Sequence, residues 1–143
     1  LGDVYKRQVR EFAPARLVFL FGCGGDRDRG KRPKMGRIAG QKADFVIVTS
    51  DNPRTEDPEA IIADILPGLK ETHTPYVVRP DRREAIAYAI ENHCPGDVII
   101  LCGKGHEDYQ EINGVKHHFS DSEVVREAFN ERRVQMLRAV EGV

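Results

Sequence analysis

Residues 45–58, FVIVTSDNPRTEDP, decide how the chain folds. The hydrophobic run Phe45–Thr49 predicts a strand, and Asp57 followed by Pro58 is typical of a capped helix start. Between them lies the polar tetrapeptide Asp51–Arg54, at the kind of strand-to-helix junction where open α/β proteins hold ligands. Its arginine offers a planar fork of donors that suits a carboxylate or a phosphate. We interpret the tetrapeptide as a ligand-recognition loop, with an ordinary turn as the alternative.

Strands and helices alternate on both sides of this loop. Apolar runs predict buried strands at residues 17–21 and 97–101 and a short strand at residues 76–78. Helices are predicted at residues 35–42 and 58–69, and after the capping boxes at residues 81–84 and 120–123. Asn113-Gly114 suits a tight turn and predicts a β-hairpin from residues 110–112 and 115–119. The pattern indicates an α/β fold: a Rossmann-like open, mostly parallel sheet with flanking helices and a C-terminal β-hairpin.

Length and composition indicate one globular domain. Residues 1–8 show no periodicity and are predicted to be a non-native or disordered leader, with residues 9–143 forming the domain. A net charge of -1 offers no field to attract nucleic acid or an anionic membrane, so neither is a predicted partner. The 3 cysteines form no CxxC pair, which argues against a disulfide framework, and we assign no metal site. No apolar run approaches the roughly 20 residues that cross a bilayer, and the predicted location is cytoplasmic.

Three polar loops follow predicted strands, at residues 22–33, 51–54 and 103–107. Successive parallel strands point the same way, so their carboxyl ends share one rim of the sheet. We therefore predict that the three loops converge on one crevice. The side chains expected to line it are Arg27, Arg29, Lys31, Arg32, those of Asp51–Arg54 and those of Gly103–Glu107.

The first loop fits two phosphate-binding motifs in part and departs from both. Residues 25–31 have the spacing of a Walker A loop, but Arg32 stands where a magnesium-binding Ser or Thr belongs. Asp26 and Asp28 would also place negative charge beside the phosphates. In the dinucleotide fingerprint, Arg27 occupies the position of the last glycine. A solvated charged loop and an arginine clamp for a carboxylate both stay open as interpretations.

The third loop carries the complementary charge. Its two glycines permit close backbone approach, and Glu107 supplies a carboxylate that can hold an ammonium, with a salt bridge to Lys104 as the alternative. Together with the arginines, this predicts a site for a zwitterion. Its carboxylates would lie on Arg27 and Arg54, and its ammonium on Glu107 and a backbone oxygen. An amino acid is therefore the better prediction than a nucleotide.

Three long motifs stand in a characteristic order: GCGGDRDRGKRP at residues 22–33, DNPRTEDP at residues 51–58 and GKGHEDYQ at residues 103–110. They resemble the C-terminal domain of the MurE family of Mur ligases, and the resemblance covers about residues 9–129. These ligases add the third peptide residue to UDP-N-acetylmuramoyl-L-alanyl-D-glutamate in peptidoglycan synthesis. In the family, a DNPR motif marks the members that select meso-diaminopimelate.

The resemblance implies a role for each matching residue. The arginine and asparagine of DNPR would hold the distal carboxylate of meso-diaminopimelate. The glutamate of GKGHE and the carbonyl of its first glycine would hold the distal ammonium, and Arg27 would address the carboxylate beside the reacting amine. The implied substrate-binding residues are Arg27, Asp51, Asn52, Pro53, Arg54, Gly103 and Glu107.

The resemblance also implies that the reaction is catalysed elsewhere. The family uses ATP to activate the glutamyl carboxylate as an acyl phosphate, which the amine attacks. ATP and Mg²⁺ would be bound mainly by a central domain that these residues lack, and the UDP-N-acetylmuramoyl-dipeptide by domains that are also absent. We therefore assign no catalytic residue, and expect a fragment of an ATP-dependent ligase that is inactive alone. The alternatives are a stand-alone amino-acid or nucleotide binding module, and a Mur ligase that adds another amino acid such as lysine.

Overall fold

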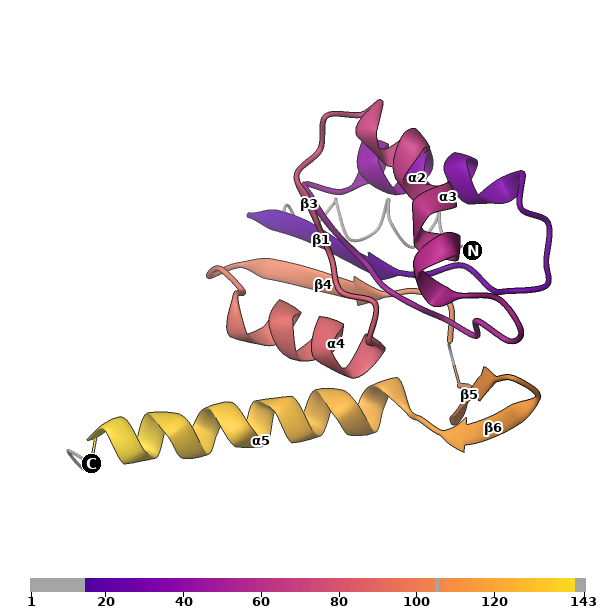
Figure 1. The fold of residues 1–143 in the computed structure, drawn as a ribbon. Coiled ribbons are helices and arrows are strands. Elements are labelled where there is room, and N and C mark those ends of the chain that lie inside the picture. The colour runs from indigo at the N-terminus through magenta and orange to yellow at the C-terminus, as the bar shows by residue number, and fades with distance from the viewer. Residues whose placement is uncertain (1–14, 105, 141–143) are drawn as a thin grey trace.

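The computed structural model describes residues 15–104 and 106–140, the last eight of them as backbone only (Figure 1). The predicted leader and the helix end expected at Val9–Phe12 lie outside the described residues. The elements are β1 Arg16–Phe21, α2 Lys31–Lys42, β2 Phe45–Val48, α3 Pro58–Lys70, β3 Tyr76–Val78, α4 Arg82–Glu91, β4 Asp97–Leu101, β5 Tyr109–Ile112, β6 Val115–His118 and α5 Asp121–Val140.

The main sheet is parallel and has the order β3-β2-β1-β4. Phe19 at its centre pairs with Val46 on one side and Ile100 on the other. The chain moves outward from β1 to β3 and then returns to the far side of β1 to form β4. Strand order thus reverses between β1 and β4, which is where open α/β sheets bind ligands. The predicted fold class is confirmed.

The sheet lies between two helical layers (Figure 1). Leu17, Phe19 and Phe21 of β1 pack into the core on the α2 and α3 side, whereas Val18 and Leu20 pack on the α4 and α5 side. All five side chains are buried, because a strand covered on both faces has no position for a polar residue. This confirms the prediction that the apolar run of β1 is buried.

Two details of the predicted elements are wrong. Helix α2 begins at Lys31 rather than near residue 35, because Pro33 falls in its first turn, where a missing N–H does no harm. Strand β4 was expected to be buried but is only half-buried. It pairs only with β1 within the described part of the chain, and so lies at an edge of the sheet there.

The predicted β-hairpin is present. Strands β5 and β6 pair in antiparallel fashion, with Ile112 opposite Val115. Asn113 and Gly114 between them have φ angles of 50° and 77°, the conformation that a tight I′ turn requires. The hairpin forms a separate two-stranded sheet, and its position is decided by contacts with the polar loops described below.

Helices α2 and α3 approach closely at two glycines. A Cβ added at Gly36 would lie 2.4 Å from the carbonyl oxygen of Ile65, and one added at Gly68 would lie 1.8 Å from that of Pro33. Neither oxygen can move without moving its helix. Gly68 lies in the last turn of α3 and permits this contact.

We expect Gly68→Ala to lower the free energy of unfolding by about 1–3 kcal/mol, although alanine has the better helix propensity, because the methyl group overpacks the contact. Denaturation followed by circular dichroism measures the loss. Gly30→Ala is the control, since a Cβ there would meet only the Asp28 carboxylate, at 3.2 Å. That variant should lose less than about 1 kcal/mol. Equal losses in the two variants would contradict the close-packing explanation.

An ion pair joins β6 to α5. His118 Nε2 lies 2.7 Å from Glu123 Oε2, on the surface. The hydrogen bond with Glu123, and then its charge, raise the pKa of His118 above its ordinary value of 6.5. The stability that this pair contributes should therefore be complete below pH 6.5 and lost as pH rises through the folded-state pKa. An NMR titration of the imidazole should report a raised pKa that Glu123→Gln returns toward the ordinary value; an unchanged titration would rule the pair out.

Candidate functional site

The loops after β1, β2 and β4 meet at one rim of the sheet, as predicted. The Gly25 N–H donates to the Asn52 carbonyl at 2.8 Å, which joins the first loop to the second. Asn52 Nδ2 donates to Glu107 Oε2 at 3.3 Å, which joins the second to the third. A Cβ added at Gly103 would lie 3.5 Å from Asp51 Oδ2, so the backbone of the third loop passes close to that carboxylate.

The DNPR loop is held by the β5–β6 hairpin. The Arg54 N–H donates to the Glu111 carbonyl at 3.0 Å, and the Arg54 carbonyl accepts from the Asn113 N–H at 2.8 Å. Gln110 Nε2 also donates to the Asp51 carbonyl at 2.8 Å. Sequence reasoning found the hairpin but not this docking, because nothing in the strand pattern shows where a hairpin packs.

Arg54 has a strained backbone. Its φ of 53° lies in the left-handed region, which costs a non-glycine residue on the order of 1–3 kcal/mol. The two backbone hydrogen bonds to the hairpin hold it there. Strain of this kind persists only where surrounding contacts fix it, and it clusters at ligand sites. The local backbone thus marks the same residue that the sequence singled out.

The Arg54 guanidinium is anchored on one side and open on the other. Nη1 donates to the Gly25 carbonyl at 2.9 Å, and Nε lies 3.5 Å from Glu111 Oε2. Nη2 has no hydrogen-bond partner within the described residues. A Cβ added at Gly24 would lie 2.9 Å from Nη1, so a side chain there would displace the guanidinium. The open nitrogen is available for an anionic group.

The Asn52 side chain is buried and already bonded within the protein. Its Oδ1 accepts from Lys104 Nζ at 3.1 Å and from the Glu111 N–H at 3.0 Å, while Nδ2 donates to Glu107. One Nδ2 hydrogen is left for another acceptor. Asn52 therefore joins the loops and can offer one donor to a ligand.

The salt bridge considered as the alternative for Glu107 is present, with Lys104 Nζ 3.7 Å from Glu107 Oε2. This salt bridge involves only one of the two carboxylate oxygens. The Glu107 side chain is 36% exposed, and its Oε1 has no partner within the described part of the chain. The two interpretations are thus compatible, because one oxygen is held by the protein and the side chain keeps a share of its surface exposed.

The remaining implied residues lie on the same loops at the rim of the sheet. Arg27 is exposed, and its Nη1 donates to the Asp26 carbonyl at 3.2 Å. Pro53 is buried against the first loop, where a Cβ added at Gly25 would lie 1.8 Å from the Pro53 carbonyl oxygen. Gly103 has a φ of 108°, a conformation that favours glycine. Arg27 can therefore adjust to a ligand, whereas the other two shape the backbone.

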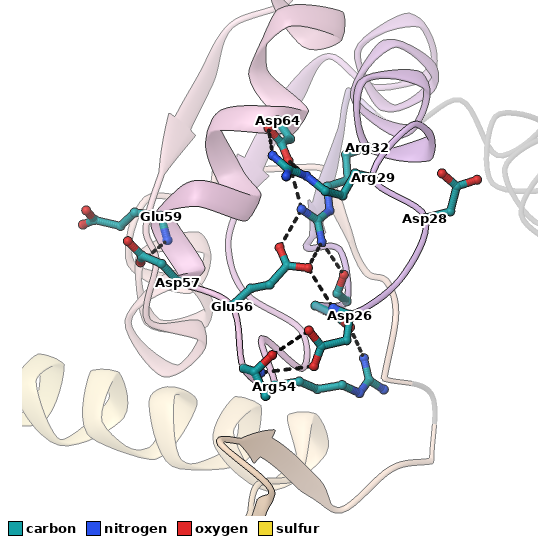
Figure 2. A network of polar contacts seen from close by, with 12 residues as sticks. Asp26, Asp28, Arg29, Arg32, Arg54, Glu56, Asp57, Glu59 and Asp64 are labelled. Atoms are coloured by element: carbon teal, nitrogen blue, oxygen red, sulfur yellow. Dashed lines mark hydrogen bonds and ion pairs between the residues drawn. The ribbon is translucent and has the colours of Figure 1, made fainter.

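The prediction that Arg32 lines the crevice is wrong. Figure 2 shows its guanidinium between Glu56 and Asp64, to which Nη1 donates at 2.8 Å and 2.9 Å. The Arg32 side chain is 1% exposed, and Nη2 also donates to the Gly24 carbonyl at 3.1 Å. Arg29, likewise expected at the crevice, pairs with Asp64 instead. These arginines fix the first loop to the start of α3.

The carboxylates in this network are stabilised in their charged form. Hydrogen bonding from Arg32, and then from the Asp26 N–H, lowers the pKa of Glu56. Hydrogen bonding from Arg29, and then from Arg32, lowers the pKa of Asp64. The Glu56 and Asp64 side chains are 25% and 27% exposed, so solvent screening limits what these shifts contribute to stability.

Sequence reasoning missed Arg82, whose side chain connects the ends of β2 and β4 to the start of α5. Its guanidinium donates to both Asp121 oxygens, at 2.8 Å and 2.7 Å, and to the carbonyls of Ser50 and Cys102, both at 3.1 Å. These carbonyls follow β2 and β4, and Asp121 begins α5. No local signal in the sequence marks it, since Arg82 stands within an ordinary capping box.

The start of α2 does not form a phosphate-binding loop of the Walker type. At the N-terminus of α2, Asp28 Oδ1 accepts from the Gly30 N–H at 2.9 Å, so a carboxylate takes a backbone donor that a phosphate would need. No three His, Cys, Asp or Glu side chains are grouped for a metal in the described ranges.

Burial raises the pKa of the Cys23 thiol to about 11, which keeps it from acting as a nucleophile. No described helix is long and apolar enough to span a membrane.

Comparisons with known proteins find similar sequences and a similar solved structure. The chain is 54% identical over 132 residues to the UDP-N-acetylmuramoyl-L-alanyl-D-glutamate–2,6-diaminopimelate ligase of Thermosynechococcus vestitus, covering 92% of this chain and 26% of that protein. For the ligase of that name from Clostridioides difficile, identity is 52% over 124 residues, with 87% and 26% covered. A solved structure of such a ligase gives a TM-score of 0.84 at 46% identity, covering 92% of this chain and 28% of that one.

The chain spans about a quarter of the length of these curated relatives. The family model described as "Mur ligase, glutamate ligase domain" matches residues 6–105, which include the whole first and second loops. The resemblance found in the three motifs is therefore confirmed, and the chain belongs to the Mur ligase family.

Proposed function

We propose that this chain is the amino-acid-recognition domain of an ATP-dependent amide ligase that adds meso-diaminopimelate to UDP-N-acetylmuramoyl-L-alanyl-D-glutamate in peptidoglycan synthesis, in the cytoplasm. The observation that carries the proposal is the meeting of two loops: Asn52 Nδ2 lies 3.3 Å from Glu107 Oε2, beside the anchored guanidinium of Arg54. The names of the relatives, which are 2,6-diaminopimelate ligases, support the same substrate.

The charges of the crevice suit a doubly zwitterionic amino acid. Arg54 and Arg27 bring guanidinium groups to one part of it, and Asp51 and Glu107 bring carboxylates to another. Lysine lacks the distal carboxylate of diaminopimelate, so lysine would leave the open side of Arg54 without a partner. Sites built to bond a polar group reject analogues that lack it strongly, because their own polar groups are left unpaired.

In this proposal the domain contributes position. Activation of the glutamyl carboxyl group with ATP is assigned mainly to the rest of a longer protein, because the start of α2 does not form a phosphate-binding loop of the Walker type. The crevice would hold the amino acid by its distal end and present the reacting amine. Its nitrogen would bond to the carbonyl carbon of the glutamyl acyl phosphate, the carbon–oxygen bond to phosphate would break, and inorganic phosphate and a proton would leave. Holding the amine in place makes its attack effectively intramolecular.

A hybrid enzyme tests this proposal. In it, the present chain replaces the matching residues of the Thermosynechococcus vestitus ligase. We expect ATP-dependent amide formation with meso-diaminopimelate, at a kcat/KM at least about 100-fold above that with lysine. Equal use of lysine would favour a ligase that adds a different amino acid. An inactive hybrid, together with micromolar binding of an amino acid or nucleotide to the isolated chain by calorimetry, would favour a stand-alone binding module.

A further inference from the structure

Lys104 is buried in the middle of the polar crevice, with 0% of its side chain exposed. Its Nζ donates to Asn52 Oδ1 at 3.1 Å and to the Tyr109 carbonyl at 2.8 Å. Asp51 Oδ1 lies 3.4 Å away and Glu107 Oε2 3.7 Å away. Burying an ammonium costs much free energy unless acceptors surround it. If these loops served only to reverse the chain, the Lys104 ammonium would be expected to lie on the surface, in water.

The partners of Lys104 are residues that the proposed function places at the ligand. By bonding Asn52 Oδ1, it fixes the amide so that Nδ2 points to Glu107, 3.3 Å away. Glu107 Oε2 then lies near both the Asn52 side-chain amide and the Lys104 ammonium. Its Oε1 is left without a partner within the described residues. One buried cation thereby sets the orientation of two side chains from different loops.

Lys104 also sets the charge of this part of the crevice. Asp51 and Glu107 bring two formal negative charges to its one positive charge, which leaves an excess of one. Asp51 Oδ1 is buried and makes no hydrogen bond within the described part of the chain. A cluster with one uncompensated negative charge suits one additional ammonium.

We infer that Lys104 is a positioning residue for amino-acid selection, which holds Asn52 and Glu107 in the arrangement that receives the distal ammonium. The inference rests on the proposed function for the identity of the ligand. Lys104 does not touch the ligand, because its side chain has no exposed surface.

Kinetics of the hybrid enzyme test this role. We expect Lys104→Met to raise the KM for meso-diaminopimelate at least about 10-fold, the loss typical of a charged hydrogen bond, with the KM for ATP within twofold. In a Glu107→Gln background the same change should add less than about twofold, because the group it positions is already lost. Lys116→Met, an exposed lysine on the neighbouring hairpin, is the control and should leave both KM values unchanged. A rise that is equal in both backgrounds, or equal for ATP, would overturn the inference.

A ligand-free measurement separates this inference from the proposed function. In the ¹⁵N spectrum of the isolated chain, Lys104→Met should shift the side-chain amide signals of Asn52 while leaving backbone signals of α2 and α3 in place. Unshifted Asn52 signals would overturn the positioning role, whatever the ligand. A hybrid that rejects meso-diaminopimelate would instead defeat the proposed function. If Lys104→Met does not fold, Lys104→Arg keeps the charge, displaces its donors and is read by the same two measurements.

Discussion

Replacing Arg54 by lysine in the hybrid enzyme is expected to raise the KM for meso-diaminopimelate about 100-fold, equivalent to about 3 kcal/mol. Lysine keeps the positive charge and can occupy the same backbone conformation at similar cost, so the change isolates the guanidinium fork. The fork is what allows Nη1 to stay on the Gly25 carbonyl while Nη2 meets a carboxylate. A single ammonium cannot do both with fixed geometry.

The same variant should lose its preference for meso-diaminopimelate over lysine, because the two amino acids differ at the carboxylate that Arg54 is proposed to hold. Steady-state kinetics with both amino acids measure the ratio of kcat/KM values. Arg29→Lys is the matched control, since Arg29 lies in the neighbouring loop, is exposed and pairs with Asp64. Its KM values should stay within about twofold of wild type. A preserved preference in Arg54→Lys would remove Arg54 from the specificity site.

Replacing Arg82 by methionine should lower the free energy of unfolding by about 3–5 kcal/mol and the Tm by about 10 °C or more. The substitution leaves the Asp121 carboxylate, whose side chain is only 13% exposed, without its buried partner. It also removes the Nη1 donor to the Ser50 carbonyl and the Nη2 donor to the Cys102 carbonyl. Methionine keeps the unbranched stem as far as the position of Nε, so most of the loss reports the polar contacts of the guanidinium.

The neighbouring residue supplies the control for Arg82. Arg83 also pairs with an α5 carboxylate, that of Glu127, but both of these side chains are more than half exposed. Arg83→Met should cost less than about 1 kcal/mol. Adding Asp121→Asn to Arg82→Met should recover part of the loss, since it removes the orphaned charge. Calorimetric unfolding of the wild type and these three variants measures both effects, and equal losses at Arg82 and Arg83 would refute the structural role of the buried pair.

The elements of the fold followed from local pattern. The apolar runs gave β1 and β2 their place in the sheet because a strand with no polar face must be covered on both sides. Asp57 and Asp81 begin α3 and α4 as predicted, and their side chains accept from the Glu59 and Glu84 N–H groups. The handedness of crossover connections then required the loops to meet at one rim, without knowledge of any contact.

The use of the charged residues did not follow from local pattern. Arg27 and Arg32 are five positions apart, yet the first is exposed in a loop and the second, in the first turn of α2, is buried between Glu56 and Asp64. A charged side chain takes the partner that packing brings within reach, and that partner here is more than 20 positions away. The spacing of charged residues along the chain therefore does not predict which of them pair.

By itself the sequence determined the α/β class, the parallel sheet and the convergence of three loops, because periodicity, capping and chain handedness act over a few residues at a time. The tertiary structure decided which polar groups are hydrogen-bonded within the protein and which remain for a ligand. Three features depend on residues brought together from distant parts of the chain. They are the docking of the hairpin on Arg54, the burial of Lys104 and the hydrogen bonds of Arg82 to carbonyls after two strands. Their geometry is a property of the packed molecule, since each hydrogen bond needs its donor and acceptor within about 3 Å.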